Sequence, residues 1–386
     1  DPFHRHASCS CPMCGLCQDE CEEVMEALRK TGRLDNTLLI ITGDNGDSFP
    51  RAKSNLYDLG CHVPFAVRWP GVIKPGSVCD GFVSLMDLAA TFYEAAGVKP
   101  KEKMDSRSLI PVFKGDYTAC RKEIYSDRER HTNTRPGGYG YPMRSVQDKD
   151  FLYIRNLYPD RLPAGTDPVY GDTGHGPAKA FMVFQRDKYP KEIFDRAFGL
   201  RPAEELYDLR KDPGCLNNVA DSVSYAKTKK KMSRRLTSWM KRTSDPRVDP
   251  GNLCFDTLPY VRKAMRIALI ETEGCLKDSH GKDIDWVRAQ IEKLRKQGVK
   301  VIELRAAGDL TEYVAALNNI KDQNALTGRE ITLLSGTETG ILAAKEAGII
   351  PAGVTWGGTD AKTMVMSGAS YVLTNQEELE LCLDFL

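Results

Sequence analysis

The sequence lacks several features that would assign it to a class at once. Its 386 residues hold 54 Lys and Arg against 53 Asp and Glu, a formal net charge of +1, so no excess of one sign indicates a nucleic-acid or membrane-surface partner. Its longest apolar run, around residues 38–41, is far shorter than the roughly 20 residues of a membrane-spanning helix. We therefore expect no nucleic-acid partner and no membrane span.

The sequence also lacks an initiator methionine, a signal peptide and any Asn-x-Ser/Thr glycosylation site. Because the chain opens abruptly with "DPFHRH", we expect a fragment. Its length predicts two or three domains. Nothing here indicates the compartment or the oligomeric state.

Cysteine is not scarce, but it is unevenly spread. Five of the twelve cysteines fall between residues 9 and 21 and seven are scattered singly, which does not indicate a disulfide framework. The cluster "CSCPMCGLCQDEC" spaces four thiols as in bacterial ferredoxins, and four thiolates could equally hold zinc. These are Cys11, Cys14, Cys17 and Cys21. Glu22 stands where proline is usual, so a cysteine-rich segment without metal stays open.

The first two thirds of the chain predict an α/β layer structure and then a smaller mixed region. We expect helices at 19–31 and 84–98, the latter with an apolar stripe of Leu85, Leu88 and Phe92, and strands at 37–42 and 63–69, the first buried on both faces. Short strands, "KEIYSD" and "FLYIRN", then occur among many Pro, Gly, Tyr and Arg residues. A basic amphipathic helix at 222–242 and a linker at 244–252 follow.

The last 120 residues or so alternate regularly between apolar strands and amphipathic helices. Strands are predicted in "MRIALIE", "VKVIEL", "EITLLSG", "PAGVTW" and "SYVLT", with helices between and after them. Such βαβ alternation is typical of a doubly wound parallel sheet.

One polar cluster follows the apolar run "LLIIT". Asp44 and Asn45 come directly after it, and Lys53 lies nine residues beyond Asp44. In a parallel α/β sheet, ligands bind beyond the carboxyl ends of the strands. Carboxylate and amide oxygens suit calcium or magnesium, and an ammonium suits an anionic oxygen. The alternative is a plain Asp-Asn-Gly turn with an exposed lysine.

The surrounding segment, "GRLDNTLLIITGDNGDSFPRAKSNLYDLGCHVPFAVRWPGVIKPGSVCDGFVSLMDLAATFYEAAGV", resembles the sulfatase family. The similarity continues through "ERHTNTRPGGYGYPMRSVQDKDFLYIRNLYPDRLPAG" and "RPAEELYDLRKDPGCLNNVA", as in the branch of N-sulfoglucosamine sulfohydrolase. The resemblance implies an alkaline-phosphatase-like α/β fold and hydrolysis of sulfate esters or sulfamates on sugars. It also implies a secretory, lysosomal or periplasmic location.

By the same resemblance, Asp44 and Asn45 would be calcium ligands and Lys53 a catalytic contact to the sulfate of the sugar substrate. His131 and Arg144 are candidate substrate contacts, and His4 in "DPFHR" is a candidate catalytic histidine. The family's nucleophile, a formylglycine made from Cys-x-Pro-Ser-Arg, has no counterpart here, and two further acidic calcium ligands are absent. We therefore expect the carboxyl-terminal part of a sulfatase, incomplete for catalysis.

"RIALIETEGCLKDS" and "LLSGTETGILAAKEAGIIPAGVTWG" resemble motifs of haloacid dehalogenase-like (HAD-like) hydrolases. The resemblance implies a Rossmann-like module in which Glu271 and Glu273 replace the nucleophilic and acid/base aspartates, with magnesium as the metal. Gly336 and Gly340 stand where acidic metal ligands are expected, and an extra methylene at residue 271 displaces its carboxylate. The alternatives are a weak phosphoester hydrolase or a fold that has lost its chemistry.

These patterns combine into one expected organisation. A cysteine-rich segment (1–29) precedes a partial sulfatase α/β core (30–120) and a carboxyl-terminal subdomain (121–250). A linker (251–264) then leads to the HAD-like module (265–386). The function expected is sulfatase-type hydrolysis; phosphoester hydrolysis, or a non-catalytic binding role, is the alternative.

Overall fold

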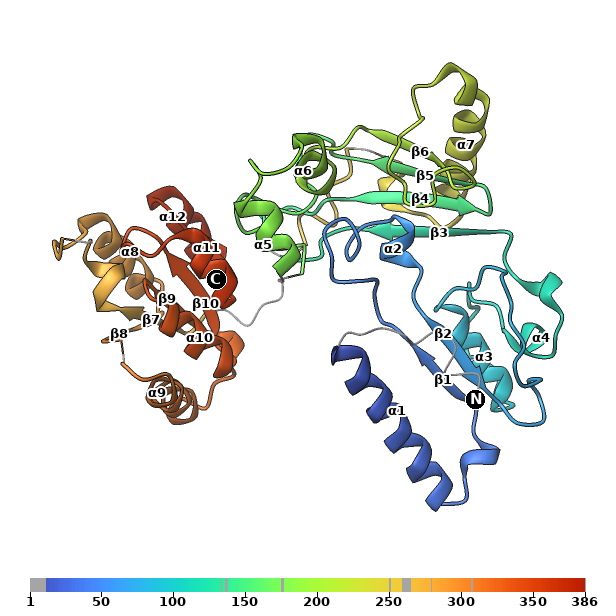
Figure 1. Ribbon diagram of the computed structural model, residues 1–386, viewed down its shortest axis with the longest axis horizontal. Helices are drawn as coiled ribbons and strands as arrows, with labels where there is room; N and C mark the ends of the chain where they lie inside the picture. Colours follow the sequence, from blue (N-terminus) through green and yellow to red (C-terminus); the bar gives the residue numbers. More distant parts are fainter. Residues whose placement is uncertain are drawn as a thin grey trace. The chain divides into compact units, whose positions relative to one another are not determined.

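The computed structural model describes residues 12–132, 134–135, 138–174, 177–249, 251–258, 265–278, 280–306 and 308–385, apart from the side chains of a few residues near the chain ends and at 177 and 329. The chain divides into two compact units. The first comprises residues 1–44, 62–125 and 146–152, and the second comprises residues 45–61, 126–145 and 153–386. Figure 1 traces the elements along the chain.

The first unit holds a long helix and a two-stranded sheet. Helix α1 (Pro12–Lys30) includes the predicted helix but starts earlier, and β1 (Leu39–Thr42) pairs antiparallel with β2 (Phe65–Arg68). The expectation that the strand at 37–42 is buried on both faces is wrong: its three apolar residues are only half-buried. The described residues give this sheet only two strands, too few to be covered like the interior of a parallel sheet.

Helix α3 (Asp87–Ala95) forms as predicted, but its apolar stripe does not. Leu85 and Phe92 are 38% and 49% exposed, whereas Asp87 and Thr91 are buried. The Asp87 carboxylate pairs with Arg121 and accepts a hydrogen bond from the backbone N–H of Arg107 at 2.9 Å. This side of the helix is therefore held by polar contacts. The short α4 (Ile110–Phe113) follows.

A four-stranded sheet in the order β3-β4-β5-β6 comes next. Its strands are β3 (Glu123–Arg128), β4 (Met143–Asp148), β5 (Phe151–Asn156) and β6 (Glu204–Asp208), accompanied by helices α2 (Asp58–Cys61), α5 (Pro177–Phe184), α6 (Lys191–Phe198) and α7 (Ala226–Arg242). β3 and β5 were predicted; β4 and β6 were not. The basic helix is confirmed as α7, which buries Met232, Leu236 and Met240 and keeps its lysines outside. Arg155 of β5 donates to Ser233 and Thr237 of this helix, each at 3.0 Å.

The carboxyl-terminal part of the second unit is a five-stranded parallel sheet in the order β11-β10-β9-β7-β8. Its strands are β7 (Ile267–Glu271), β8 (Lys300–Leu304), β9 (Ile331–Ser335), β10 (Ile350–Val354) and β11 (Tyr371–Leu373). Its helices are α8 (Asp285–Lys296), α9 (Leu310–Gln323), α10 (Glu338–Glu346), α11 (Ala361–Ser367) and α12 (Gln376–Phe385). The predicted alternation and parallel pairing are confirmed.

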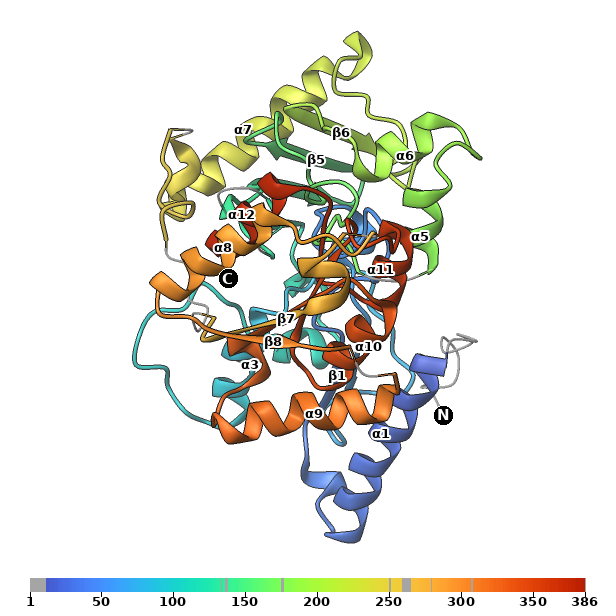
Figure 2. The same cartoon turned by 90° about the vertical axis from the view of Figure 1, so that its left-hand side faces the viewer.

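Helices cover both faces of this sheet. Figure 2 shows α8 and α12 on one side of the sheet and α9 on the other. One apolar cluster includes Ile291 of α8 and Leu379 of α12, and a second includes Leu317 of α9 and Ala344 of α10. The strands β7 and β9 are buried along their whole length between these clusters. The sheet is therefore doubly wound, as the sequence predicts.

None of the described helices combines the length and the apolar character that crossing a bilayer requires.

Candidate functional site

The loop after β1 carries the predicted Asp-Asn pair. Asp44 and Asn45 are exposed, and Lys53 is half-buried. Residues 45–61 fold back on themselves: a side chain at Gly46 would meet the backbone carbonyl of Leu59 at 2.2 Å. The Lys53 N–H donates to the Asp47 carbonyl at 2.9 Å. Because β1 and β2 are antiparallel, the rule for ligands at parallel strand ends does not apply to this pair of strands.

The oxygens of this loop do not make a complete calcium site. Calcium takes six to eight oxygen ligands, and Asp44 with Asn45 offers two residues. Among the described residues, no group of three or more His, Cys, Asp or Glu side chains is placed to hold a metal ion. The calcium role of the pair stays a prediction that requires further ligands.

His131 lies against a buried carboxylate. Its Nδ1 is 3.2 Å from Oδ1 of Asp172 and 3.1 Å from Oγ of Ser54. Arg128 and Arg135 also contact Asp172, with Nη2–Oδ2 distances of 2.5 and 2.7 Å. Burial opposes ionisation of Asp172, but the hydrogen bond from His131 and the two guanidinium charges outweigh it and hold the pKa of this carboxyl well below its usual range.

The same cluster fixes the backbone next to Lys53. Ser54 Oγ donates to the Asp172 carbonyl at 2.7 Å, and Arg128 Nη1 donates to the Ser54 carbonyl at 2.5 Å. Ser54, the residue after Lys53, thus contacts His131, which belongs to a motif far away in the sequence. His131 is 35% exposed in its side chain, so it can still meet a ligand.

Sequence reasoning missed Asp172 and a buried lysine beside it. Lys179 of α5 is 1% exposed and donates to the carbonyls of Tyr170 and Thr173, at 3.0 and 3.2 Å. Burial lowers the pKa of Lys179 to about 8, although Asp172 opposes this shift. Neither residue lies in a motif, so no signal in the sequence singles them out.

Arg144 was predicted to contact the substrate and is instead held by the protein. It is 2% exposed. Its Nε and Nη2 donate to Asp245 at 2.6 and 3.0 Å, Nη2 also donates to Glu129 at 2.7 Å, and Nη1 donates to backbone carbonyls. With every guanidinium nitrogen engaged, this arrangement favours a structural role, and the substrate contact stays a prediction.

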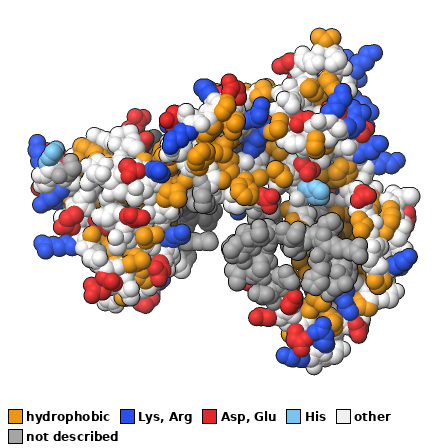
Figure 3. All heavy atoms as spheres, in the orientation of Figure 1, with side chains coloured by type: hydrophobic (Ala, Val, Ile, Leu, Met, Phe, Trp, Pro, Cys, Tyr) orange, Lys and Arg blue, Asp and Glu red, His pale blue; other side chains and the backbone are white. Residues whose placement is uncertain are grey.

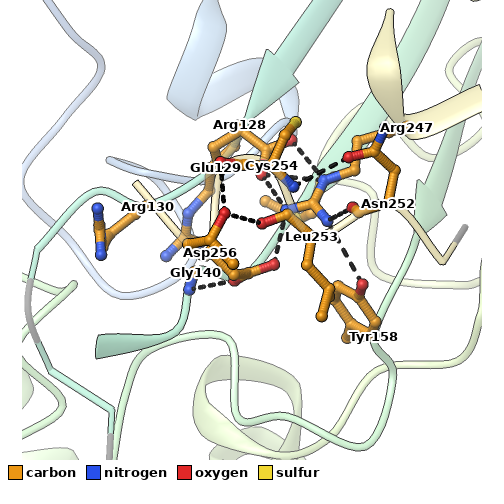
Figure 4. Close-up of polar contacts among 12 residues, drawn as sticks. Arg128, Glu129, Arg130, Gly140, Tyr158, Arg247, Asn252, Leu253, Cys254 and Asp256 are labelled. Atoms are coloured by element: carbon orange, nitrogen blue, oxygen red, sulfur yellow. Dashed lines mark hydrogen bonds and ion pairs between the residues drawn. The ribbon is translucent and has the colours of Figure 1, made fainter. Parts of the chain in front are cut away.

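The segment 244–252 is not a loose linker, and that expectation is wrong. Arg247 within it is 1% exposed; Figure 4 shows its guanidinium between two carboxylates. Its Nη2 lies 2.7 Å from Oε2 of Glu129 and 3.0 Å from Oδ2 of Asp256, and its Nη1 donates to the Asn252 carbonyl at 2.7 Å. The Pro-Gly-Asp composition suggested a linker, but Arg247 ties the segment to the sheet.

At the carboxyl end of the parallel sheet, Glu271 is completely buried, with 0% exposure. Its carboxylate accepts hydrogen bonds from the Tyr313 hydroxyl at 2.8 Å, the Gly336 N–H at 3.1 Å and the Thr337 hydroxyl at 3.2 Å. Burial raises the pKa of Glu271, and these donors partly offset the shift. Glu273, its predicted acid/base partner, is exposed.

Gly336 and Gly340, which stand where acidic residues were expected, lie where the structure leaves no room for a side chain. A side chain at Gly340 would lie 2.0 Å from Oε1 of Glu271, and one at Gly336 would lie 2.7 Å from the backbone of Gly274. The carboxylate of Glu271 therefore occupies the space that a side chain at residue 340 would need. Trp356 Nε1 donates to the Cys275 carbonyl at 3.0 Å and holds the loop after β10 against the loop after β7.

The amino-terminal candidates fall largely outside the described part of the chain. His4 and Cys11 lie outside the described residues. Cys14 and Cys17 lie on α1 in a stretch whose side chains are not described, and Cys21 is half-buried on the same helix. Zinc or iron–sulfur binding by these four cysteines stays a prediction.

Comparison with known proteins gives a consistent result for the amino-terminal part. A protein-family model described as "Sulfatase" matches residues 18–98. An ulvan-active sulfatase of Formosa agariphila is 33% identical over 224 residues, which is 58% of this chain and 41% of that protein. Human N-sulphoglucosamine sulphohydrolase is 30% identical over 235 residues, 58% of this chain and 45% of that protein.

Two solved structures align with parts of the chain. One, in complex with D-glucosamine-2-N,6-O-disulfate, aligns with a TM-score of 0.42 at 22% identity, covering 59% of this chain and 38% of its own. A cobalt-bound deoxy-D-mannose-octulosonate 8-phosphate phosphatase of Haemophilus influenzae aligns with a TM-score of 0.24 at 17% identity, covering 31% of this chain and 86% of its own.

The chain thus spans less than half the length of these two curated relatives. Within that span, the amino-terminal 58% or so of the chain is similar in sequence to sulfatases.

Proposed function

We propose that residues 30–250 act in the hydrolysis of a sulfate ester or sulfamate on a sugar. The observation that carries this proposal is the sequence similarity to sulfatases, 33% and 30% identity over 58% of the chain. The names of those relatives, an ulvan-active sulfatase and N-sulphoglucosamine sulphohydrolase, indicate the substrate class: a sulfated or N-sulfated sugar.

In this proposal Lys53 and His131 contact the anionic group of the sugar. An ammonium and an imidazole can both donate hydrogen bonds to sulfate oxygens, and the contact of His131 with Ser54, the residue next to Lys53, supports the pairing. Asp44 and Asn45 would contribute two of the oxygen ligands of a calcium ion. Because no Cys-x-Pro-Ser-Arg string occurs in the sequence, we expect this chain to bind the sugar without releasing sulfate.

Calorimetry with the purified chain tests the proposal. Glucosamine N-sulfate and glucosamine 6-sulfate are compared with glucosamine, in calcium and in EDTA, while ion chromatography follows free sulfate. We expect the sulfated sugars to bind more tightly, and Lys53→Ala to weaken that binding by about tenfold because a charge-assisted hydrogen bond is lost.

Lys230→Ala is the matched control, because Lys230 is an exposed lysine of α7 remote in sequence from the cluster. It should leave sugar binding unchanged. Equal binding of sulfated and unsulfated glucosamine would overturn the proposal. Release of sulfate by this chain would instead show that another nucleophile replaces the formylglycine.

For residues 265–386 we propose a HAD-like module with a non-catalytic role. The observation that favours it is the environment of Glu271, which is inaccessible to solvent and already bound by three neutral donors. A nucleophile must reach the phosphorus atom, and acidic magnesium ligands at residues 336 and 340 are replaced by glycine. The residues present therefore do not fit a magnesium site of that family.

A phosphatase assay separates the two alternatives for this module. With p-nitrophenyl phosphate and magnesium, we expect no hydrolysis above buffer, in the wild type and in Glu271→Gln alike. Magnesium-dependent hydrolysis that is lost in Glu271→Gln would restore the phosphoester-hydrolase alternative.

A further inference from the structure

A small cavity lies within the second unit, and Arg51 and Tyr57 of the 45–61 segment form part of its lining. It has a volume of about 190 Å³, and its lining includes Arg51, Tyr57, Leu200, Arg201, Glu205 and Tyr207. Figure 3 shows apolar side chains gathered on the surface over α5 and α6. Leu200, two residues after the end of α6, lines the cavity and is 59% exposed. The cavity can therefore be reached from outside.

Two arginines of this lining are held by neutral groups only. Arg51 Nη2 donates to the Tyr207 hydroxyl at 3.1 Å and to the Cys215 carbonyl at 2.6 Å. Arg201 donates to the Tyr57 hydroxyl and, through Nη2 at 3.1 Å, to the Asn55 side-chain carbonyl. Among the described residues, neither guanidinium has an ion pair with a carboxylate.

The lining has two carboxylates: Asp195 pairs with Lys191, and Glu205 is bound by neutral donors. Glu205 is 2% exposed and accepts from the hydroxyls of Tyr57 and Tyr207, at 2.7 and 2.5 Å, and from the Asn156 amide at 2.7 Å. The negative charge of Glu205 offsets part of the positive charge of the two arginines, but its oxygens already accept hydrogen bonds from neutral donors. Burial lowers the pKa of Arg201 to about 10, while Glu205 opposes this shift, as expected for a cation that pays a net cost for leaving water.

Among the described residues, three guanidinium nitrogens of these two arginines have no hydrogen-bond partner. They are Nε and Nη1 of Arg51 and Nε of Arg201, all closed off from solvent. Buried N–H groups are nearly always bonded, and each unsatisfied one is costly. Arg51 also has a positive φ of 68°, a conformation that side-chain-bearing residues adopt at a cost and that recurs at ligand sites. Unsatisfied donors, positive charge and backbone strain thus occur in two residues that line one cavity.

We propose that this cavity binds a tetrahedral oxyanion of the sulfate class, either free or attached to a sugar. Four oxygens around one centre can accept from two guanidinium groups that approach from different residues, and the negative charge neutralises two buried cations. The choice of sulfate over other tetrahedral oxyanions rests on the proposed function; oxyanion binding itself does not.

Thermal unfolding in EDTA, with millimolar sodium sulfate and sodium chloride keeping ionic strength constant, tests the site without calcium. Sulfate also stabilises proteins by exclusion from their surface, so the informative quantity is the difference between variants. We expect a saturable rise in Tm for the wild type. Arg201→Gln and Arg51→Gln should each weaken the apparent affinity by at least about tenfold, the loss of one charge-assisted hydrogen bond.

The control variant is Arg210→Gln. Arg210 follows β6, the strand that carries Glu205 and Tyr207 of the lining. Its guanidinium is paired with Asp208 at 2.7 Å, so its loss should leave the sulfate response unchanged. Arg201→Lys keeps the charge and should retain part of the response if Arg201→Gln folds poorly. Equal sulfate responses in the wild type and Arg201→Gln, each with native far-UV circular dichroism, would overturn the proposal.

Two further measurements distinguish free sulfate from a sugar-linked sulfate group. They also keep this test independent of the proposed function. Inorganic sulfate that binds while glucosamine 6-sulfate does not would identify a site for the free anion; competition between them would identify a sugar-linked group. Because these measurements need no calcium and do not involve Lys53, Lys53→Ala should leave their results unchanged. Failure of sugar binding at Lys53 would therefore not be confused with failure here.

A second inference comes from the first unit, where two scattered cysteines meet. Cys79 Sγ and Cys120 Sγ are 3.3 Å apart, and an isolated bridge between Phe82 and Arg121 joins the two chain segments beside them. We infer that these thiols form a disulfide in an oxidising environment. Two thiols and one oxidised glutathione would yield the protein disulfide and two reduced glutathiones, with both thiol protons carried to the product.

Mass spectrometry after equilibration with oxidised glutathione and alkylation tests this inference. We expect one linked peptide pair containing Cys79 and Cys120, lost in Cys79→Ser, while the free thiols of Cys61 and Cys254 are alkylated. Alkylation of Cys79 and Cys120 to the same extent as Cys61 and Cys254 would overturn it.

Discussion

Two buried arginines in the second unit, Arg247 and Arg201, have opposite electrostatic surroundings. Arg247 is 1% exposed and lies between the carboxylates of Glu129 and Asp256. Burial alone would lower its pKa, but these partners raise it above the usual value. Arg201 is 7% exposed, has neutral partners only, and has a pKa lowered to about 10 by burial.

This difference distinguishes a charge that stabilises the fold, Arg247, from a charge that we propose binds a ligand, Arg201. A buried ion pair offsets the cost of leaving water only when its partners are well placed, as they are around Arg247 (Figure 4). Arg201 lacks that compensation, and so it should contribute little stability until an anion arrives. Each prediction below tests one side of this contrast.

The largest effect is expected at Arg247. Replacing it in Arg247→Met leaves Glu129 and Asp256 without their shared cation, and removal of one partner of a buried pair typically costs about 3–5 kcal/mol. Urea unfolding followed by circular dichroism measures this loss of free energy. A change near zero would mean that this network does not hold the fold and would remove the contrast.

Asp172 should give the next largest effect, with a dependence on pH. Asp172→Asn leaves Arg128 and Arg135 unpaired, and we expect a loss of about 3 kcal/mol at neutral pH. Because the folded pKa of Asp172 lies below its ordinary value of 3.8, its contribution is present above that value and is lost as pH falls below it. Unfolding curves of the wild type and the variant should therefore converge in acid; a constant difference would contradict the assignment.

Arg201→Met should differ from Arg247→Met although both remove a buried guanidinium. Without a bound anion, we expect stability to change by less than about 1 kcal/mol in either direction, because an uncompensated buried charge is lost. The same urea experiment, in sulfate-free chloride buffer, measures it. A loss as large as that of Arg247→Met would show that Arg201 already has its full complement of partners.

How far the sequence could predict these regions also differs. The parallel sheet followed from periodicity, since its strands and helices alternate locally and each pattern is read within a dozen residues. The arginine clusters could not be predicted, because their partners are distant: Arg51 bonds to Cys215, 164 residues away. The motif around Lys53 includes Ser54, which contacts His131 of a second motif, but Asp172, which contacts both Ser54 and His131, lies in no recognisable pattern.

The stripe on α3 and the linker at 244–252 failed for a related reason. Composition predicted both, yet long-range ion pairs decide them: Asp87 with Arg121 buries the polar side of α3, and Arg247 buries the segment that contains it. A pattern of apolar residues says which surface could be buried, whereas the position of a distant counter-charge decides which one is.

Glu271 is a buried acid to which the comparison between Arg201 and Arg247 also applies. Like Arg201, it has neutral partners: Tyr313, Gly336 and Thr337 donate to its carboxylate, and among the described residues no cation pairs with it. Burial raises its folded pKa above the ordinary value of 4.5. A carboxyl with a raised folded pKa contributes stability below its unfolded pKa and loses it as pH rises through the folded one.

Glu271→Gln should therefore have the smallest effect at any one pH, within about 1 kcal/mol. The substitution replaces one acceptor oxygen by an NH2 group, which is unfavourable, but it also removes a buried charge, which is favourable. Its sign should depend on pH: the variant gains on the wild type as pH rises from acid to neutral. Urea unfolding at several pH values between those limits measures the difference. If the wild type instead gained on the variant as pH rose, a counter-ion must compensate Glu271, and this acid would belong with Arg247 rather than with Arg201.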